Sequence, residues 1–246
     1  MHTESPVNLA ASPPAGVRPF LAALAIAVAI DAALRWWIVA TRGAQFEASA
    51  SWFQSTIGGT VLLHALVTVA FFVLLVLVWN SARAGRSPSR RMLLWLGLLA
   101  SATLLANLIA VNVAIYRRNT GSYALLAQSF ALYAATNLIF VFWYWFHDHL
   151  LRVMASPGAR TDDFHFGIQF PEERSAASGG GCDGAPGWRP GLVDYAYFTL
   201  LSSNCFGSPE GHVVIGRVLK LLQIVHTVFM IFIFIIIVAR AINTLG

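Results

Sequence analysis

Long apolar stretches, separated by short polar ones, dominate the chain. A helix needs about 20 mostly apolar residues to cross the hydrocarbon core of a bilayer. Five stretches reach that length: 19–40, 56–79, 92–116, 123–146 and 218–242. Strands of a membrane β-barrel would show alternating segments of about 10 residues, and these stretches do not alternate. The pattern predicts an all-α integral membrane protein with about five spanning helices.

The polar stretches divide the chain into regions. Residues 1–16 are rich in Ser, Pro and Ala and lack the cationic start of a secretory signal, so we expect a disordered tail before a first helix that is retained. Residues 17–150 then form a four-helix transmembrane region. Residues 151–190 hold acidic residues and a run of three glycines, which predicts one long hydrophilic loop.

One apolar segment before the last helix is too short to span a bilayer. It runs over 191–207, GLVDYAYFTLLSSNCFG, and we expect a re-entrant or interfacial helix over 192–204. The sequence Ser208-Pro209-Glu210 follows, with a capping hydroxyl, a proline and an acid in the order that begins a helix. The last spanning helix should therefore begin near Pro209.

The composition agrees with a membrane protein. Hydrophobic residues make up 57% of the 246 and charged residues 11%, with mean hydropathy +0.67, whereas soluble domains carry about 25% charged residues. The net charge is +5, but the bases lie at the ends of apolar runs, so we expect no nucleic-acid binding. Two cysteines, Cys182 and Cys205, make neither a disulfide framework nor a metal site.

Loop charges predict an orientation. The second loop, 80–91, has four arginines and no acid, and the fourth, 151–190, has four more. The positive-inside rule places both loops and the N-terminus in the cytoplasm and the C-terminus outside. The pair Arg117 and Arg118 in the third loop argues the other way.

The C-terminal end, from Asp194 onward, resembles the pore loop and inner helix of the potassium-channel superfamily. Asp194, Tyr197 and Phe198 match the start of the pore helix. Counted on without gaps, the filter falls on Cys205, Phe206, Gly207, Ser208, Pro209 and Glu210, where Gly207 keeps the first glycine and Glu210 replaces the acid.

Over residues 56–243 the chain is similar to an uncharacterised family of bacterial multi-pass inner-membrane proteins with a short Phe-Pro element, here Phe170-Pro171, and a degenerate channel-like C-terminus. The resemblance implies the bacterial cytoplasmic (inner) membrane, a homo-oligomer built as a tetramer, an inorganic cation as a partner beside the lipid bilayer, and no cofactor.

The chain departs from a potassium filter in ways that matter physically. A filter points backbone carbonyls at the ion, and its glycines supply the φ values that permit this. Pro209 stands at the second glycine position and fixes φ near −65°. The charge rule also places this loop on the cytoplasmic side, whereas a potassium filter faces outward. An inverted pore loop and a non-conducting relic both remain open.

Several polar residues within the apolar stretches are candidates for function. Asp31 and Arg35, four residues apart, form either an ion site or a local ion pair. A polar stripe on the last helix either lines a hydrated path or bonds to other helices; it comprises Lys220, Gln223, His226 and Thr227. The end of the short segment offers groups to a solute or caps an interfacial turn; it comprises Ser202, Ser203, Asn204 and Cys205.

Histidines suggest two further readings. His64 and His226 each lie near the middle of a helix, where two facing imidazoles could ligate a haem. The alternative is that each forms a single hydrogen bond. His147, Asp148 and His149 end the fourth stretch; histidines two residues apart point to different sides of a helix, so we expect a charged cap at water level and no metal site.

The chain has no phosphate-binding loop, nucleophile elbow or zinc-protease motif, so we expect no enzyme. The sequence predicts a channel-like membrane protein that conducts cations through a degenerate pore loop. A non-conducting scaffold or sensor that uses 151–190 as a contact surface is the alternative, and a haem-binding electron carrier is a second one.

Overall fold

The computed structural model describes residues 16–46, 51–115, 122–154, 167–173, 188–205 and 207–245. Over these residues the chain is mostly helical. Its elements are α1 (Arg18–Phe46), α2 (Ser51–Arg83), α3 (Arg90–Ile115), α4 (Ser122–Met154), β1 (Gly167–Gln169), α6 (Leu192–Cys205), β2 (Val213–Ile215) and α7 (Arg217–Leu245). A short helical turn occupies 171–173.

The long helices follow the apolar stretches, and local signals end them. At the C-terminus of α2, Gly85 takes φ 72°, and the amide of Arg86 donates to the carbonyl of Ser81 at 3.1 Å. This is a glycine-terminated helix end. Six residues, 84–89, separate α2 from α3. At the start of α3 the hydroxyl of Ser89 accepts from the amide of Met92 at 3.3 Å. The tight turn makes α2 and α3 antiparallel neighbours.

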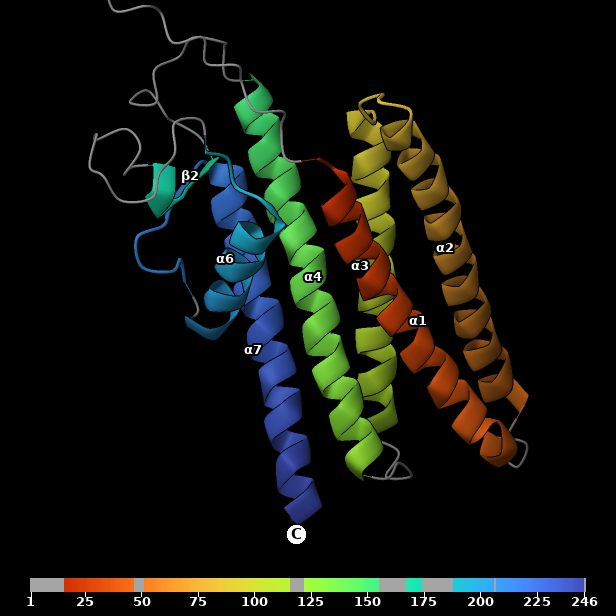
Figure 1. Ribbon diagram of the computed structural model, residues 1–246. Coiled ribbons are helices and arrows are strands. Elements are labelled where there is room, and N and C mark those ends of the chain that lie inside the picture. The colour runs from red at the N-terminus through yellow and green to blue at the C-terminus, as the bar shows by residue number, and fades with distance from the viewer. Residues whose placement is uncertain are drawn as a thin grey trace, which may run out of the picture.

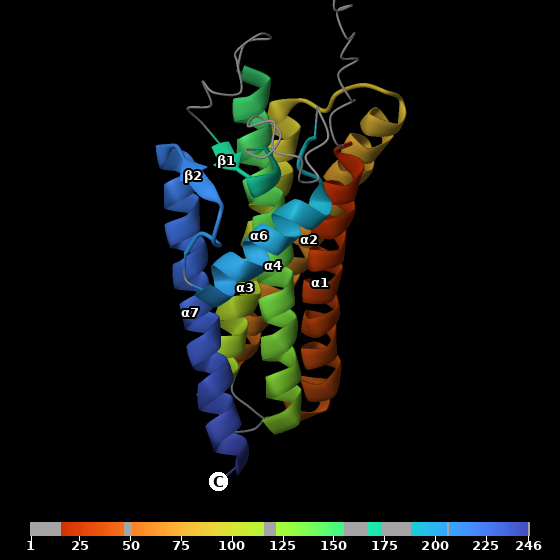
Figure 2. The ribbon, with the colours of Figure 1, turned by 60° about the vertical axis from the view of Figure 1, so that its left-hand side comes forward.

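Helix α4 stands at the centre of the bundle. It packs against α1, α3, α6 and α7. Helices α2 and α7 lie on opposite sides of the bundle (Figures 1 and 2). The N-terminus of α1, the α2–α3 turn, the C-terminus of α4 and the start of α7 share one end of the bundle (Figure 1). We call it the basic end, because the exposed arginines Arg18, Arg83, Arg86, Arg90, Arg91, Arg189 and Arg217 lie there.

A two-stranded antiparallel sheet lies at the basic end. Strand β1 pairs with β2 so that Ile168 stands opposite Val214, and both side chains are buried. Since β1 precedes α6 and β2 follows it, the sheet joins the two chain segments that flank this short helix (Figure 2).

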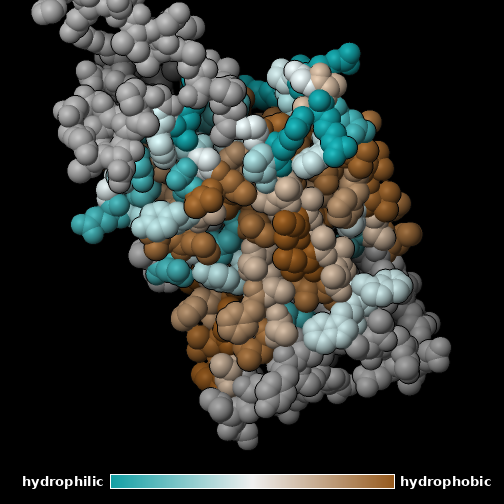
Figure 3. Space-filling model, in the orientation of Figure 1, coloured by the Kyte–Doolittle hydropathy of each residue, from teal (hydrophilic) through white to brown (hydrophobic). Residues whose placement is uncertain are grey.

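Four helices of the described residues are long and apolar enough to cross a membrane; these spans are Leu62–Arg83, Arg90–Ile109, Leu126–Arg152 and Arg217–Ala239. Apolar side chains cover the helices below the basic end, and hydrophilic ones gather at that end (Figure 3). Helix α1 has 29 residues but carries Asp31 and Arg35 and is not among the four. The predicted all-α architecture holds for the described residues, and a fifth span stays a prediction.

The structure corrects two expectations. The last helix begins at Arg217 and not near Pro209, because residues 213–215 form β2 and Gly211 and Gly216 adopt positive φ (83° and 108°). The region 151–190 is also not one continuous loop. Helix α4 continues to Met154, and the buried Phe170 anchors the turn that follows β1.

Candidate functional site: a half-length helix held between two long ones

Helix α6 buries one face against α4 and α7. Its buried side chains include Tyr195, Phe198, Thr199 and Ser202, which follow the i, i+3, i+4, i+7 spacing of one helix face. Val193, Tyr197 and Leu200 are exposed on the opposite face. The helix begins at a local cap, in which the carboxylate of Asp194 accepts from the amide of Gly191 at 2.6 Å. A helix of 14 residues is about 21 Å long and cannot cross a bilayer.

The far end of α6 is fixed by His226 of α7. The imidazole is fully buried and stacks on the ring of Phe140 with the centroids 4.1 Å apart. Its Nδ1 lies 3.2 Å from the hydroxyl of Tyr144, and its Nε2 lies 3.2 Å from the hydroxyl of Ser203. Ser203 also donates toward Asn137 Oδ1 and the carbonyl of Thr199.

This network defines the histidine's hydrogen-bonding roles. A serine hydroxyl carries one proton, and that of Ser203 is directed at acceptors, so His226 Nε2 is the donor toward Ser203. Nδ1 then accepts from the hydroxyl of Tyr144. A neutral imidazole satisfies both contacts, and side chains from α4, α6 and α7 meet in the cluster.

The same contact gives the depth that α6 reaches. His226 follows Arg217 by nine residues, which is about 14 Å along a helix. Ser203 therefore lies about 14 Å below the start of α7, close to half of a hydrocarbon core of about 30 Å. The chain then returns to the basic end at β2, so α6 and the return segment, residues 207–212, enter and leave on one side (Figures 1 and 2).

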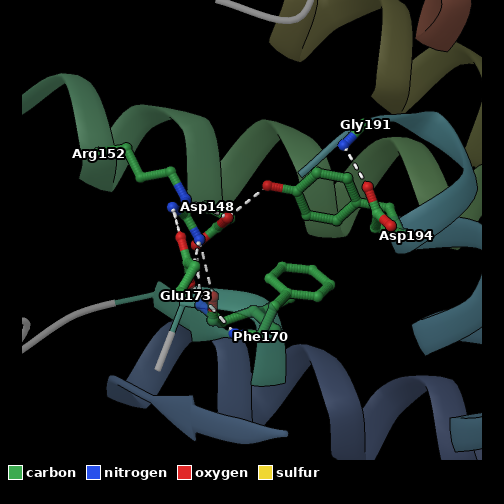
Figure 4. A network of polar contacts seen from close by, with 8 residues as sticks. Asp148, Arg152, Phe170, Glu173, Gly191 and Asp194 are labelled. Carbon is green, nitrogen blue, oxygen red and sulfur yellow. Dashed lines mark hydrogen bonds and ion pairs between the residues drawn. The ribbon is translucent and has the colours of Figure 1, made fainter. Parts of the chain in front are cut away.

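At the basic end, Asp148 of α4 is the central acceptor (Figure 4). Its carboxylate is fully buried and accepts from the hydroxyl of Tyr195, from Arg152 Nε at 2.7 Å and from the amide of Ile168 at 2.8 Å. Three donors surround one buried charge, which is the condition for burying it at low cost. This corrects the expectation that Asp148 belongs to a cap at water level: the carboxylate joins α4, β1 and α6.

Arg152 and Glu173 extend this network to the Phe-Pro element. The guanidinium of Arg152 donates to Glu173 and, at 2.8 Å, to the carbonyl of Ile168. Glu173 also accepts from the amide of Phe170 at 3.1 Å. Burial, and then the neighbouring Asp148 carboxylate, raise the pKa of Tyr195 well above its ordinary value, so its phenol keeps the proton that it donates.

The return segment and the helix ends beside it carry exposed polar groups. Ser208 bonds to the amide of Gln223 at 3.0 Å. Pro209 is buried, and the exposed Glu210 follows it. Asn204 at the end of α6 is exposed, while its side-chain oxygen accepts from the hydroxyl of Tyr133 at 3.1 Å. We call Asn204, Ser208, Glu210 and Lys220 the lateral polar patch.

The other candidates from the sequence are distributed as follows. Within the predicted stripe on α7, Lys220 is exposed, Gln223 and Thr227 are half-buried and His226 is buried. Gly207 is half-buried, and Ser202 is buried with no hydrogen-bond partner for its hydroxyl among the described residues. Phe206 and the side chains of Arg35 and Cys205 lie outside the described residues.

The pairing of Asp31 with Arg35 lies outside the described residues, because the Arg35 side chain does. The described partners of Asp31 are His64 Nε2 at 3.0 Å and Asn107 Nδ2 at 2.7 Å, on α2 and α3. His64 and His226 stand in separate clusters on the two outermost helices (Figure 1), so one chain does not bring them together as a haem-ligand pair. Among the described residues, no three His, Cys, Asp or Glu side chains gather as a metal site.

Sequence reasoning missed Asn137, Tyr144, Arg152, Glu173 and Tyr195 as parts of this unit. The only available signal was polar residues within or beside apolar stretches.

Comparison with protein-family models, with curated protein sequences and with solved structures gives no match for this chain.

Proposed function

We propose that this chain is a multi-pass protein of the bacterial cytoplasmic membrane and that copies of it assemble, as a tetramer, around a cation path built from α6, the return segment and α7. The proposal rests on one observation: the lateral polar patch extends from Lys220, about 5 Å below the start of α7, past Ser208, which bonds to Gln223 about 9 Å below it, to Asn204, which follows Ser203 at about 14 Å. In a bilayer, polar groups at that depth must face protein or water.

The surroundings of the patch are apolar. On α7 the exposed side chains around it include Val218, Leu221, Ile224 and Val225, which suit lipid or a packed neighbour. Beside the ammonium group of Lys220, the patch contains an acid, Glu210, and amide and hydroxyl oxygens, which are ligands that hard cations prefer. A second copy placed against this side would remove the patch from lipid and enclose it.

A second candidate is a non-conducting membrane scaffold with the same architecture. The hydrogen bonds of Ser203 and His226 favour it, because both side chains bond to α4 of the same subunit and not toward a path between subunits. The polar network around Asp148 would then hold the 151–190 region as a contact surface. Deletion of 175–187 should abolish capture of a partner and leave any ion flux unchanged.

Flux measurements with the full-length protein in liposomes test the first proposal. We expect potassium or sodium flux, reduced several-fold by Glu210→Gln because the substitution removes the only charged oxygen of the patch. Glu172→Gln is the matched control, since Glu172 is an exposed acid outside the patch. Absence of cation flux from the wild-type protein under every voltage and pH applied would overturn the cation path and leave the scaffold.

Assembly is tested separately by cross-linking. In a background with Cys182→Ser and Cys205→Ser, Asn204→Cys should form disulfide-linked oligomers in native membranes. Leu66→Cys, on the exposed face of α2, should not. Cross-linking at Leu66 without cross-linking at Asn204 would place the interface on the wrong side of the molecule.

A further inference from the structure

A second polar cluster lies in the other half of the molecule, where α1, α2 and α3 meet. Asp31, His64 and Asn107 are each at most 6% exposed. The carboxylate of Asp31 uses one oxygen for His64 Nε2 at 3.0 Å and the other for Asn107 Nδ2 at 2.7 Å. Asp31 follows Arg18 by 13 residues, about 20 Å along α1, so the cluster is deep in the bundle.

The hydroxyl of Thr68 completes the surroundings of His64. It lies 3.4 Å from His64 Nδ1, on the side of the ring away from Asp31. A threonine hydroxyl both donates and accepts. It can donate to a bare Nδ1, and after a rotation it can accept from a protonated one. Both charge states of the imidazole therefore keep their hydrogen bonds without any movement of the helices.

One atom of the cluster is unsatisfied. Asn107 Oδ1 is buried and has no hydrogen-bond donor among the described residues. The amide orientation is fixed by its neighbour, because a flipped Asn107 would turn an oxygen toward the Asp31 carboxylate. A buried amide oxygen without a donor costs about 1–3 kcal/mol. In Asn107 this oxygen is the amide atom that does not contact Asp31, because Nδ2 does.

We propose that Asp31, His64, Thr68 and Asn107 form a proton-binding site. In the unprotonated form, His64 is neutral, Nε2–H donates to the Asp31 carboxylate, and the cluster carries one negative charge. A proton from water adds to Nδ1 and gives an imidazolium beside the carboxylate, which brings the charge of the cluster to zero. Asn107 Nδ2 keeps its hydrogen bond to Asp31 in both forms.

A metal cation fits the cluster less well. Both Asp31 oxygens already accept hydrogen bonds, and Na⁺ or Mg²⁺ would require several more oxygen ligands. A proton requires only the bare ring nitrogen. Among the described residues no Lys or Arg pairs with the Asp31 carboxylate. A charge deep in a bundle is costly, which gives the deprotonated site a reason to take up a proton.

The helices that pack around this site carry other titratable or charged groups. By sequence, these residues are Arg18, Arg35 and Arg42 on α1, Arg83 on α2, Arg90 and Arg91 on α3, and Tyr123, Tyr133, Tyr144, His147, Asp148, His149 and Arg152 on α4. Arg35 is the nearest along the chain, one turn from Asp31. Tyr133 bonds to Asn204 on the α6 side.

Histidine ¹⁵N NMR of the full-length protein in lipid nanodiscs tests the proposal. The His64 signals are assigned by their loss in His64→Gln. We expect a neutral ring protonated at Nε2 at high pH and a doubly protonated ring at low pH. Asp31→Asn should move the midpoint of this titration to lower pH, because it removes the negative charge that stabilises the imidazolium.

Thr68→Val gives an independent variant that preserves shape. It leaves the new Nδ1–H without an acceptor, so it should also move the midpoint to lower pH, while His226→Gln should leave it unchanged. A His64 ring with one protonation state at every pH, or a midpoint unaffected by either substitution, would overturn the proposal and leave a static structural contact. Cation flux plays no part in these outcomes, so they are independent of the proposed pore.

Discussion

The hydroxyl of Tyr195 on α6 donates to the buried carboxylate of Asp148 on α4, 47 residues earlier in the chain. Tyr195→Phe keeps the ring, which stacks edge-on against Phe20 and Phe170, and removes only this bond. Loss of a hydrogen bond to a charged group should cost about 1.5–3 kcal/mol. Thermal unfolding of the full-length protein in detergent measures it.

Tyr197→Phe is the control for that substitution. Tyr197 is 55% exposed on the opposite face of α6, so its change should stay within about 0.5 kcal/mol. Equal effects of the two substitutions would contradict the role given to the Asp148 contact.

Gly97 lies where α3 approaches the side chains of α4 closely. A Cβ at this position would stand 2.7 Å from Phe142 Cε1 and 2.8 Å from Trp143 Cζ2. Gly97→Ala should therefore destabilise by about 1–3 kcal/mol, as overpacking does, and lower the unfolding temperature. In an open helix the same change would stabilise by about 0.8–1 kcal/mol, so a raised unfolding temperature would show that these helices are not in contact. Leu98→Ala, at an exposed position, is the control.

Gly216 tests the link between β2 and α7. Its φ is 108°, and an added Cβ would meet no atom within 4 Å, so Gly216→Ala introduces backbone strain alone, worth about 1–3 kcal/mol. The expected result is faster hydrogen exchange at the amides that join β1 to β2. Gly16→Ala, whose Cβ also meets nothing and whose φ is not in the left-handed region, should leave that exchange unchanged.

The shared basic end predicts the membrane orientation. With Cys182 and Cys205 replaced by Ser, Ser87→Cys in the α2–α3 turn and Glu172→Cys after β1 should react with an impermeant thiol reagent from the same side. The arginines of this end favour the cytoplasmic side. Reaction from opposite sides would contradict the arrangement of the helices, and reaction of both from outside would contradict the charge rule.

The long helices were predictable because their signal is local. Apolar stretches of sufficient length predicted α1 to α4 and α7 to within a few residues over most ends, and the short helix expected over 192–204 matches α6. The start of α7 was wrong because Ser208, Pro209 and Glu210 resemble a helix start locally. Pairing with β1, about 45 residues earlier, determines the strand there instead, and strands of three residues leave no periodicity to read.

The sequence showed which polar groups lie in apolar stretches, but it did not determine their partners. The spacing of Asp31 and Arg35 left an ion site and a local ion pair open, and the described partners of Asp31 are His64 and Asn107, 33 and 76 residues away. His226 was placed in a stripe that either lines a hydrated path or bonds to other helices, and its two described polar partners come from α4 and α6. Sequence identifies which polar residues are placed in apolar stretches; the crossing of the helices determines which of them meet.

The anchoring of the Phe-Pro element has a practical consequence for studying the protein. Glu173 is held by Arg152, and Trp188 lies against Phe170 with ring centroids 5.8 Å apart. The two described residues that border the 174–187 interval are therefore held by contacts with residues outside that interval. An epitope tag or fluorescent label inserted there should leave α6 in place, which makes this interval the natural attachment point for following the protein in living cells.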